Sequence, residues 1–196
     1  MDFSLHKCKF VLRLTTTPPR RTLPAIQPQK DAMSDTYAIR PAEFRDAEQI
    51  FGLIKTFPDE LLGRPIGDIV QNIDRFLVAE KDGTIVGTVS WHVLHEIGAP
   101  RHPYIEIKSL AVAKGFQGRG IGRDLVTRAI QRVTPMHPAR IIALTFTPPF
   151  FKSLGFVEVP KEQLMHKIYM GCINCSKYDS PFTCPETAMV LEIQNP

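Results

Sequence analysis

The sequence predicts an α/β fold in which helices flank a central mixed β-sheet. Helical and strand-like hydrophobic patterns alternate from residue 36 onward, a tight-turn signal joins two strand-like runs, and a glycine-rich loop links a strand directly to an amphipathic helix. The chain has 196 residues, of which 43% are hydrophobic and 22% charged, a balance typical of a protein that buries one core. We therefore expect a single folded domain.

The first part of the regular pattern predicts two helices after a short strand. Apolar and polar residues alternate over residues 37–40, and Pro41 then suits the first turn of a helix, where its missing N–H costs little. Apolar side chains recur at helical spacing over residues 42–57. A second helix is expected to begin at Pro65.

The rest of the chain predicts a hairpin, further strands and two more helices. Residues 76–80 and 84–89 have the composition of strands, and the turn between them ends in Gly83, which readily adopts a positive φ. A longer strand is expected at residues 104–112. The remaining elements, in chain order, are a glycine-rich loop, a helix at 121–133, a strand at 141–146, a short helix at 148–154 and strands at 156–159 and 187–193.

The net positive charge is concentrated in the first 33 residues. They hold six Lys/Arg and two acidic residues, whereas the rest of the chain has 18 of each sign and is neutral. A neutral domain gives no support to a nucleic-acid-binding surface, and no apolar run approaches the ~18 residues needed to cross a bilayer. We therefore expect neither nucleic acid nor a membrane as a partner.

Residues 34–196 form the expected domain, and residues 1–33 form a basic extension rich in Pro and Thr. We expect the extension to be disordered, or to come from an upstream start codon with the true start at Met33. Its Arg and Thr content with few acids also suits an organelle transit peptide, whereas the apolar core of a secretory signal is missing. The protein is therefore expected to be cytoplasmic.

The glycine-rich loop is the most informative segment of the chain. Its glycines let backbone N–H groups turn inward, and the helix that follows adds a partial positive charge, so that the loop can hold a pyrophosphate. The dinucleotide fingerprint fits poorly because the loop follows the fourth strand, and no lysine stands in the frame of a nucleotide-hydrolysing loop. The candidate pyrophosphate ligands are Gln117, Gly118, Arg119, Gly120, Ile121 and Gly122.

Two motifs resemble those of the GNAT superfamily of N-acetyltransferases. Gln117, Gly120 and Gly122 match its Gln/Arg-x-x-Gly-x-Gly/Ala signature between a strand and a helix, and residues 150–156 match an aromatic helix that ends in Leu-Gly-Phe. The resemblance covers about residues 37–194. It implies the GNAT fold, with a mixed and mostly antiparallel sheet, and acetyl-CoA as the co-substrate.

By that resemblance, acetyl-CoA would rest its pyrophosphate on residues 117–122. Its pantetheine arm would pair with the backbone of Leu110, Ala111 and Val112, and Phe151 would pack against it. The N–H of Val112 would stabilise the negative charge that develops on the thioester oxygen. Where family members often have a Tyr that protonates the departing thiolate, this chain has Phe151, so the thiolate would be protonated by water or another residue, or leave unprotonated.

The C-terminal third narrows the resemblance to the stand-alone bacterial N-acetylglutamate synthases. Residues 61–65, 106–112 and 166–190 contain segments similar to that group, which usually has Arg where this chain has Lys108. The similarity implies acetyl transfer to the α-amine of L-glutamate, the first step of arginine biosynthesis, and allows a homodimer. The alternatives are acetylation of another small amine or of a protein N-terminus, and a non-catalytic acyl-CoA-binding module.

Acetyl transfer requires an unprotonated amine, although α-amines mostly carry a proton near neutral pH. Glu106 occupies the family's general-base position and would accept that proton directly or through a water. Because side chains alternate along a strand, Glu106, Lys108 and Leu110 are expected on one face. Lys108 would then anchor a substrate carboxylate, with Arg64 as a second candidate because its planar fork suits carboxylates. The alternatives are an ordinary solvated ion pair between Glu106 and Lys108, and a solvated loop charge at Arg64.

Three of the four cysteines lie close together near the C-terminus. Cys172, Cys175 and Cys184 could supply thiolates to a tetrahedral zinc, with His166 as the fourth ligand. Reduced structural thiols are the main alternative, and a disulfide or redox pair is another. Residues 166–186 are otherwise expected to form a loop.

Overall fold

The computed structural model describes residues 36–95, 103–175 and 177–193. The predicted extension, residues 1–33, lies outside the described residues, so its three interpretations stay predictions. The described residues belong to one compact unit, Asp35–Pro196. No helix within them has the length and apolar character needed to cross a membrane.

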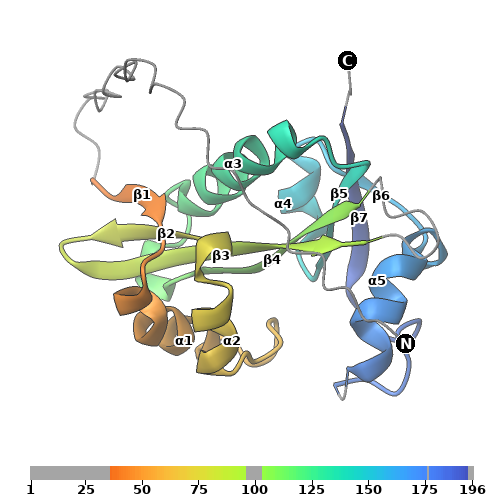
Figure 1. The fold of residues 1–196 in the computed structure, drawn as a ribbon, viewed down its shortest axis with the longest axis horizontal. Helices are drawn as coiled ribbons and strands as arrows, with labels where there is room; N and C mark the ends of the chain where they lie inside the picture. Colours follow the sequence, from red (N-terminus) through yellow and green to blue (C-terminus); the bar gives the residue numbers. More distant parts are fainter. Residues whose placement is uncertain (1–35, 96–102, 176, 194–196) are drawn as a thin grey trace, which may run out of the picture. The chain divides into compact units, whose positions relative to one another are not determined.

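A seven-stranded sheet organises the described part of the chain, in the order β1-β2-β3-β4-β5-β7-β6 (Figure 1). Neighbouring strands run antiparallel except β4 and β5, which are parallel. The predicted mixed and mostly antiparallel sheet is therefore confirmed. The strands are β1 (Ala38–Pro41), β2 (Phe76–Lys81), β3 (Thr84–Leu94), β4 (Tyr104–Val112), β5 (Arg140–Thr145), β6 (Val157–Glu158) and β7 (Thr187–Glu192).

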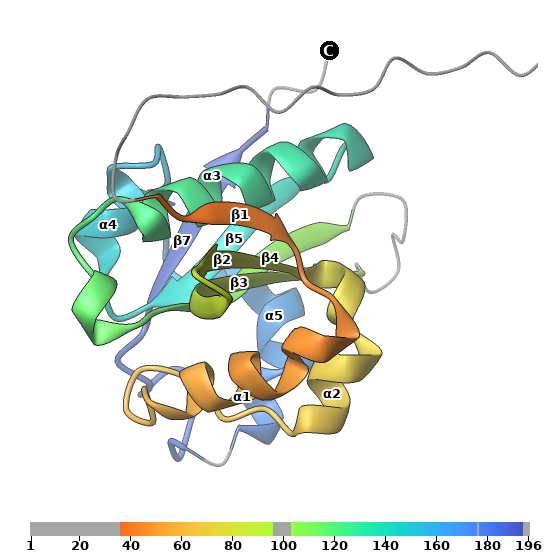
Figure 2. The same ribbon diagram turned by 90° about the vertical axis from the view of Figure 1, so that its left-hand side faces the viewer.

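Helices cover both faces of this sheet (Figure 2). One face carries α3 and α4, and the other carries α1, α2 and, farther along the strands, α5. The helices are α1 (Ala47–Lys55), α2 (Ile66–Gln71), α3 (Ile121–Val133), α4 (Pro148–Lys152) and α5 (Met165–Met170).

Each face of the sheet has its own apolar core. On the α3 face, Leu125 and Ala129 pack with Ile107 of β4. On the opposite face, Ile50 of α1 packs with Phe76 of β2. Full burial of a large apolar side chain stabilises the fold by about 1.5–3 kcal/mol. The central strands, buried from both sides, therefore form a rigid frame for the backbone groups along β4.

The boundaries near prolines differ from the sequence prediction. Pro41 ends β1 instead of starting a helix, and α1 begins only after a 3-10 turn, Phe44–Asp46. The Arg40 guanidinium holds this turn through an ion pair with Asp46 at 2.6 Å. Pro65 lies just before α2, as the residue that caps its N-terminus.

The hairpin prediction is confirmed, whereas β3 is longer than predicted and α5 forms in a segment that was expected to be a loop. Asp82 and Gly83 have φ values of 51° and 76°, which form the tight turn between β2 and β3. β3 continues to Leu94, past its predicted end, because its second half pairs with β4. Part of the expected C-terminal loop forms α5, a six-residue helix that packs through the buried Ile168. So short a helix is stabilised by packing, which periodicity does not reveal.

β4 contains a bulge at Ser109. Ser90 of β3 pairs with Lys108, and Thr88 pairs with Ala111, so two residues of β4 oppose one residue of β3. Ser109 has a φ of 53°, in the left-handed region that side chains other than glycine rarely adopt. The bulge is therefore a strained point in the middle of the central strand.

The bulge decides which side chains of β4 share a face. Glu106, Lys108 and, past the bulge, Ala111 lie on the side of α1 and α2. Leu110 instead packs into the core on the α3 side. The prediction that Leu110 shares the face of Glu106 and Lys108 is therefore wrong, because the extra residue reverses the alternation.

Candidate active site

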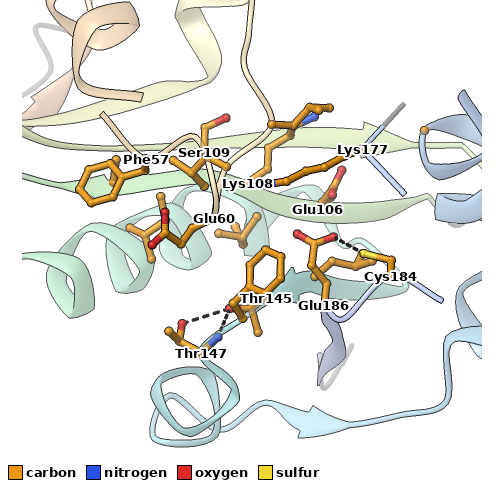
Figure 3. A pocket seen from close by; sticks show the side chains of 18 of the residues that line it. Phe57, Glu60, Glu106, Lys108, Ser109, Thr145, Thr147, Lys177, Cys184 and Glu186 are labelled. Atoms are coloured by element: carbon orange, nitrogen blue, oxygen red, sulfur yellow. Dashed lines mark hydrogen bonds between the residues drawn. The ribbon is translucent and has the colours of Figure 1, made fainter. Parts of the chain in front are cut away.

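β4 and β5 separate near the centre of the sheet and leave a cavity between them. Their parallel pairing covers Tyr104–Glu106 opposite Arg140–Ile142, and both strands continue beyond it. The cavity has a volume of about 430 Å³ and is lined by residues 106–112, by residues 144–147 and by side chains from the C-terminal segment (Figure 3). Backbone as well as side-chain groups of β4 therefore border the cavity.

Glu106 lies in the wall that β4 contributes. Its side chain is only 5% exposed, and its Oε1 accepts a hydrogen bond from Nζ of Lys167 at 2.8 Å. Its Oε2 is buried and has no hydrogen-bond partner among the described residues. One oxygen is thus fixed by a cation, while the other can accept a proton from a group in the cavity.

Lys167, on α5, is a site residue that sequence reasoning missed. Burial lowers its pKa, but the charge of Glu106 and the hydrogen bond to it outweigh this effect, so that the pKa of Lys167 is raised. The Lys167 ammonium therefore stays protonated beside Glu106. The two residues lie far apart in the sequence, and no local pattern connects them.

Lys108 shares the face of Glu106, as predicted, and lines the cavity. Burial lowers the pKa of Lys108, with a further lowering from Lys167, while the charge of Glu106 acts in the opposite direction. Within the described residues, no hydrogen bond or ion pair involves its ammonium. The alternative of a solvated Glu106–Lys108 pair is wrong, because Glu106 is buried and pairs with Lys167.

Arg64 does not line the cavity. Its guanidinium pairs with Asp68 at 2.5 Å, donates to the hydroxyls of Ser90 at 3.1 Å and Ser109 at 3.2 Å, and lies over the Phe76 ring at 5.0 Å. With a side chain only 13% exposed, it is not a solvated loop charge. Its role as a carboxylate ligand stays a prediction.

The glycine-rich loop has the backbone shape that a phosphate cradle needs. Gly118 and Gly120 have φ values of 77° and 86°, and a Cβ added to either would meet nothing within 4 Å. Gly120 directly precedes α3, whose first N–H groups have no partners within the helix. The loop therefore combines open space with a helix N-terminus, and it fits an anionic pyrophosphate.

The other residues of this segment make individual contacts. Gln117 lines the cavity and donates from Nε2 to the carbonyl of Val112 at 3.1 Å. The Arg119 guanidinium donates to a carbonyl of the loop at 3.1 Å. Ile121 is buried and anchors the loop in the core, while a Cβ on Gly122 would make ordinary contact with Val112 at 3.7 Å. Only some of the predicted segment is therefore free to face a ligand.

The backbone of Val112 faces the cavity side of β4. The N–H of Ala113 donates to the carbonyl of Val86 at 2.9 Å, which makes these two a hydrogen-bonded pair of the β3–β4 ladder. Pairs alternate along an antiparallel ladder, so the next pair, Val112 and Gly87, directs its N–H and C=O groups away from the partner strand. For Val112, this direction is toward β5 and the cavity.

Phe151 lines the cavity with a buried aromatic ring. It is 4% exposed and makes edge-to-face contacts with Phe150 and Phe156, each with ring centroids 5.2 Å apart. The ring therefore offers packing but no proton. Thr145 and Thr147, whose hydroxyls are 3.1 Å apart, line the same cavity.

The C-terminal segment contributes a carboxylate and thiols that sequence reasoning did not place in the site. Glu186 and Cys184 line the cavity opposite β4 (Figure 3). The Cys184 thiol donates to Glu186 at 3.6 Å. Burial raises the pKa of the Glu186 carboxyl. Local sequence patterns do not predict this wall, because turns of the folded chain bring its residues to the site.

The zinc prediction is not supported. Cys172, Cys175 and Cys184 are free thiols, and burial raises the pKa of Cys172 and of Cys184. The ring of His166 packs against an aromatic ring of β4. Across the described ranges, no group of three or more His, Cys, Asp or Glu side chains could hold a metal ion.

The site combines three features: a parallel strand pair that separates around a cavity, a helix N-terminus preceded by glycines, and a buried carboxylate. Together they indicate a class of protein, the acyl-CoA-dependent acyltransferases. Residues 34–158 match the model of the Acetyltransferase (GNAT) family, and the chain belongs to this family. It is therefore an acetyl-CoA-dependent N-acetyltransferase of the GNAT type.

Known proteins with similar sequences and structures agree with this assignment. The chain is 32% identical over 154 residues to "Uncharacterized N-acetyltransferase CT2212" of Chlorobaculum tepidum, covering 78% of this chain and 94% of that protein. It is 29% identical over 146 residues to "Amino-acid acetyltransferase" of Mycobacterium tuberculosis, covering 72% and 79%. The crystal structure of Rv2747 from Mycobacterium tuberculosis, in complex with CoA and a second ligand, has a TM-score of 0.66 at 26% identity and covers 80% of this chain and 99% of that one.

Proposed function

We propose that the protein transfers the acetyl group of acetyl-CoA to the α-amine of L-glutamate, the first step of arginine biosynthesis. The observation that carries this proposal is the pair of Glu106 and Lys108 on one face of β4. Among the described residues, one oxygen of this carboxylate has no hydrogen-bond partner and the ammonium has no ion pair. Such a pair suits an amino acid, whose amine and carboxylate are one carbon apart. The similarity to a named amino-acid acetyltransferase and the motifs shared with N-acetylglutamate synthases support it.

In this proposal Glu106 is the general base. Its Oε2 accepts a proton from the substrate ammonium, directly or through a water, and the neutral amine attacks the thioester carbonyl of acetyl-CoA. Lys167 holds Oε1, so the free oxygen is the one that meets the substrate. General-base catalysis of this kind contributes typically 10²–10⁴-fold to the rate, roughly the size of effect expected here.

The proposed tetrahedral intermediate is stabilised by the backbone of β4. The N–H of Val112 donates to the negative oxygen, while the neighbouring backbone of Leu110 and Ala111 orients the pantetheine and residues 117–122 hold the pyrophosphate. Phe151 packs against the thioester without donating to it. The sulfur then leaves as a thiolate, a feasible leaving group because free thiols have a pKa of about 8.5. The proton that the attacking nitrogen loses as the amide forms passes to water or to this thiolate.

The lysines that line the cavity support an acidic substrate once their partners are counted, and the carboxyl groups that line it are those of Glu60, Glu106 and Glu186. Lys167 is paired with Glu106, and Lys177 donates to two backbone carbonyls. Lys108 is left to bind a substrate carboxylate. Glu186 lines the cavity beside Cys184, and burial raises the pKa of its carboxyl.

The test is free-thiol release from acetyl-CoA by the full-length chain with L-glutamate, L-glutamine, L-aspartate and spermidine as acceptors. We expect the highest kcat/KM with L-glutamate and a clear loss with L-glutamine, its uncharged isostere. Preference for spermidine would make the protein a polyamine acetyltransferase. CoA binding without release from any acceptor would make it a non-catalytic acyl-CoA-binding module.

A further inference from the structure

The bulge of β4 requires support from its surroundings. Ser109 is buried and has a φ of 53°, which an L side chain adopts only at a cost in conformational energy. Such strain persists in a folded protein only where neighbouring groups hold the backbone in place. The contacts of Ser109 and of the residue before it show which groups do so.

The Arg64 guanidinium is connected to Ser109 and, through a second serine, to the residue before it. Nη1 of Arg64 donates to Oγ of Ser109 at 3.2 Å and to Oγ of Ser90 at 3.1 Å. Ser90, which is buried on β3, in turn donates from Oγ to the backbone carbonyl of Lys108 at 3.2 Å. Arg64 therefore contacts the side chain of the bulged residue and, through Ser90, the carbonyl that precedes it.

Arg64 is itself held by α2 and β2. Its Nε pairs with Asp68 at 2.5 Å, and its guanidinium lies 5.0 Å from the centre of the Phe76 ring. Asn72 donates to Asp68 at 3.1 Å and fixes that carboxylate. A planar guanidinium presents its donors in a rigid fork, which a flexible ammonium does not reproduce. The connection from α2 to the bulge is thus preorganised.

We propose that Arg64 is a positioning residue that holds the β4 bulge in shape and so sets the affinity of the site for CoA. The bulge turns Leu110 toward the α3 side and the N–H of Val112 toward the cavity. Without Arg64, Ser109 relaxes toward negative φ, and the backbone of residues 110–112 no longer meets the pantetheine. This inference rests on the proposed use of that backbone in binding acetyl-CoA.

The experiment compares CoA affinity, measured by isothermal titration calorimetry on the full-length chain, for Arg64→Ala, Ser109→Gly and the double variant. We expect Arg64→Ala to weaken CoA binding about tenfold and Ser109→Gly to leave it nearly unchanged. The double variant should recover affinity to within about threefold of the wild type, because glycine adopts positive φ without help. Arg45→Ala is the matched control, since Arg45 is an exposed arginine that pairs with Glu43.

Thiol-release kinetics separate this role from direct substrate binding. An Arg64→Ala variant with unchanged CoA affinity and a raised KM for the amine alone would make Arg64 a substrate ligand and overturn the proposal. A double variant no better than Arg64→Ala would overturn it as well. Calorimetry does not depend on turnover, so a wild-type protein that binds CoA but acetylates no amine would contradict the proposed function without affecting this comparison.

A milder variant keeps the test open if Arg64→Ala does not fold. Ser90→Ala removes the hydrogen bond that Ser90 accepts from Arg64 and the one that it donates to the carbonyl of Lys108. It leaves the contacts of Arg64 with Ser109 and Asp68 in place. We expect this variant to fold, as judged by circular dichroism, and to bind CoA about threefold more weakly. Affinity equal to the wild type would show that the bulge does not depend on this chain of contacts.

Discussion

The two walls of the cavity differ in how their geometry arises. The β4 wall, residues 106–112, belongs to a long central strand whose position follows from its ladder with β3. The C-terminal wall, residues 167–186, consists of a short helix and turns and is joined to the rest by individual contacts such as Lys167 with Glu106. The difference implies that β4 carries the chemistry and the C-terminal wall adjusts it. Substitutions on β4 should therefore have the larger effects.

The largest effect is expected at Glu106. Glu106→Gln keeps the shape of the side chain but removes the proton acceptor, so kcat should fall roughly 10²–10⁴-fold with little change in CoA affinity. Thiol release and calorimetry on the same preparation measure the two quantities. Wild-type turnover in this variant would remove Glu106 from the base role and place the chemistry elsewhere in the cavity.

Lys108 should affect substrate binding more than turnover. Lys108→Met removes a charged donor to a carboxylate, which corresponds to about 1.5–3 kcal/mol, or roughly a 10–100-fold increase in the KM for L-glutamate. Because burial lowers the pKa of Lys108 below the ordinary 10.5, its charge is present at low pH and is lost as pH rises through that lowered value. The KM should therefore increase at a lower pH than an ordinary lysine would predict.

Lys108→Arg provides the control for this pH dependence. A guanidinium stays charged throughout the range, so the variant should retain most of the affinity and lose the alkaline increase in KM. An unchanged alkaline increase would assign the titration to another group, such as the substrate amine.

On the C-terminal wall, Lys167→Met should have a smaller effect, about tenfold on kcat/KM at neutral pH. The variant leaves a buried carboxylate without its cation and releases Oε1 of Glu106, so the loss should fall on kcat with little change in CoA affinity by calorimetry. A loss of CoA affinity as large as the loss of kcat/KM would instead indicate a structural role for Lys167.

The smallest effect is expected at the thiols. Cys184→Ser preserves a donor to Glu186, so kcat/KM should change by less than about twofold.

Treatment with a metal chelator should leave the melting temperature unchanged, because the described residues hold no metal-binding group. A chelator-dependent drop in melting temperature would restore the zinc hypothesis and make the C-terminal wall a metal-stabilised element.

The difference between the β4 wall and the C-terminal wall also explains how much of the site could be predicted from the sequence. The bounds of β4 and α3 match the prediction, since both have strong periodicity and flank a glycine-rich motif. Glu106 and Lys108 were placed on one face because that part of β4 is regular. The bulge was missed because no local rule describes the positive φ of Ser109 or its contact with the distant Arg64.

Long-range pairing also limited the prediction of the C-terminal wall. Lys167 gains its role from Glu106, and α5 is too short to show helical periodicity. Pro41 misled the prediction of the first helix, since proline is equally compatible with the end of an edge strand. In each case a contact between distant segments decided the outcome.

The short pairing between β4 and β5 affects how readily the folded chain opens locally. Three residue pairs join β4 to β5. Within the sheet, these pairs connect the four strands β1 to β4 with the three strands β5, β7 and β6. Local opening starts where few bonds resist it, so amide hydrogen exchange should be fastest along the facing edges beyond Ile142. A pantetheine laid between those edges would slow this exchange and raise resistance to proteolysis. The availability of acetyl-CoA would then govern how long each molecule survives as well as how fast it works.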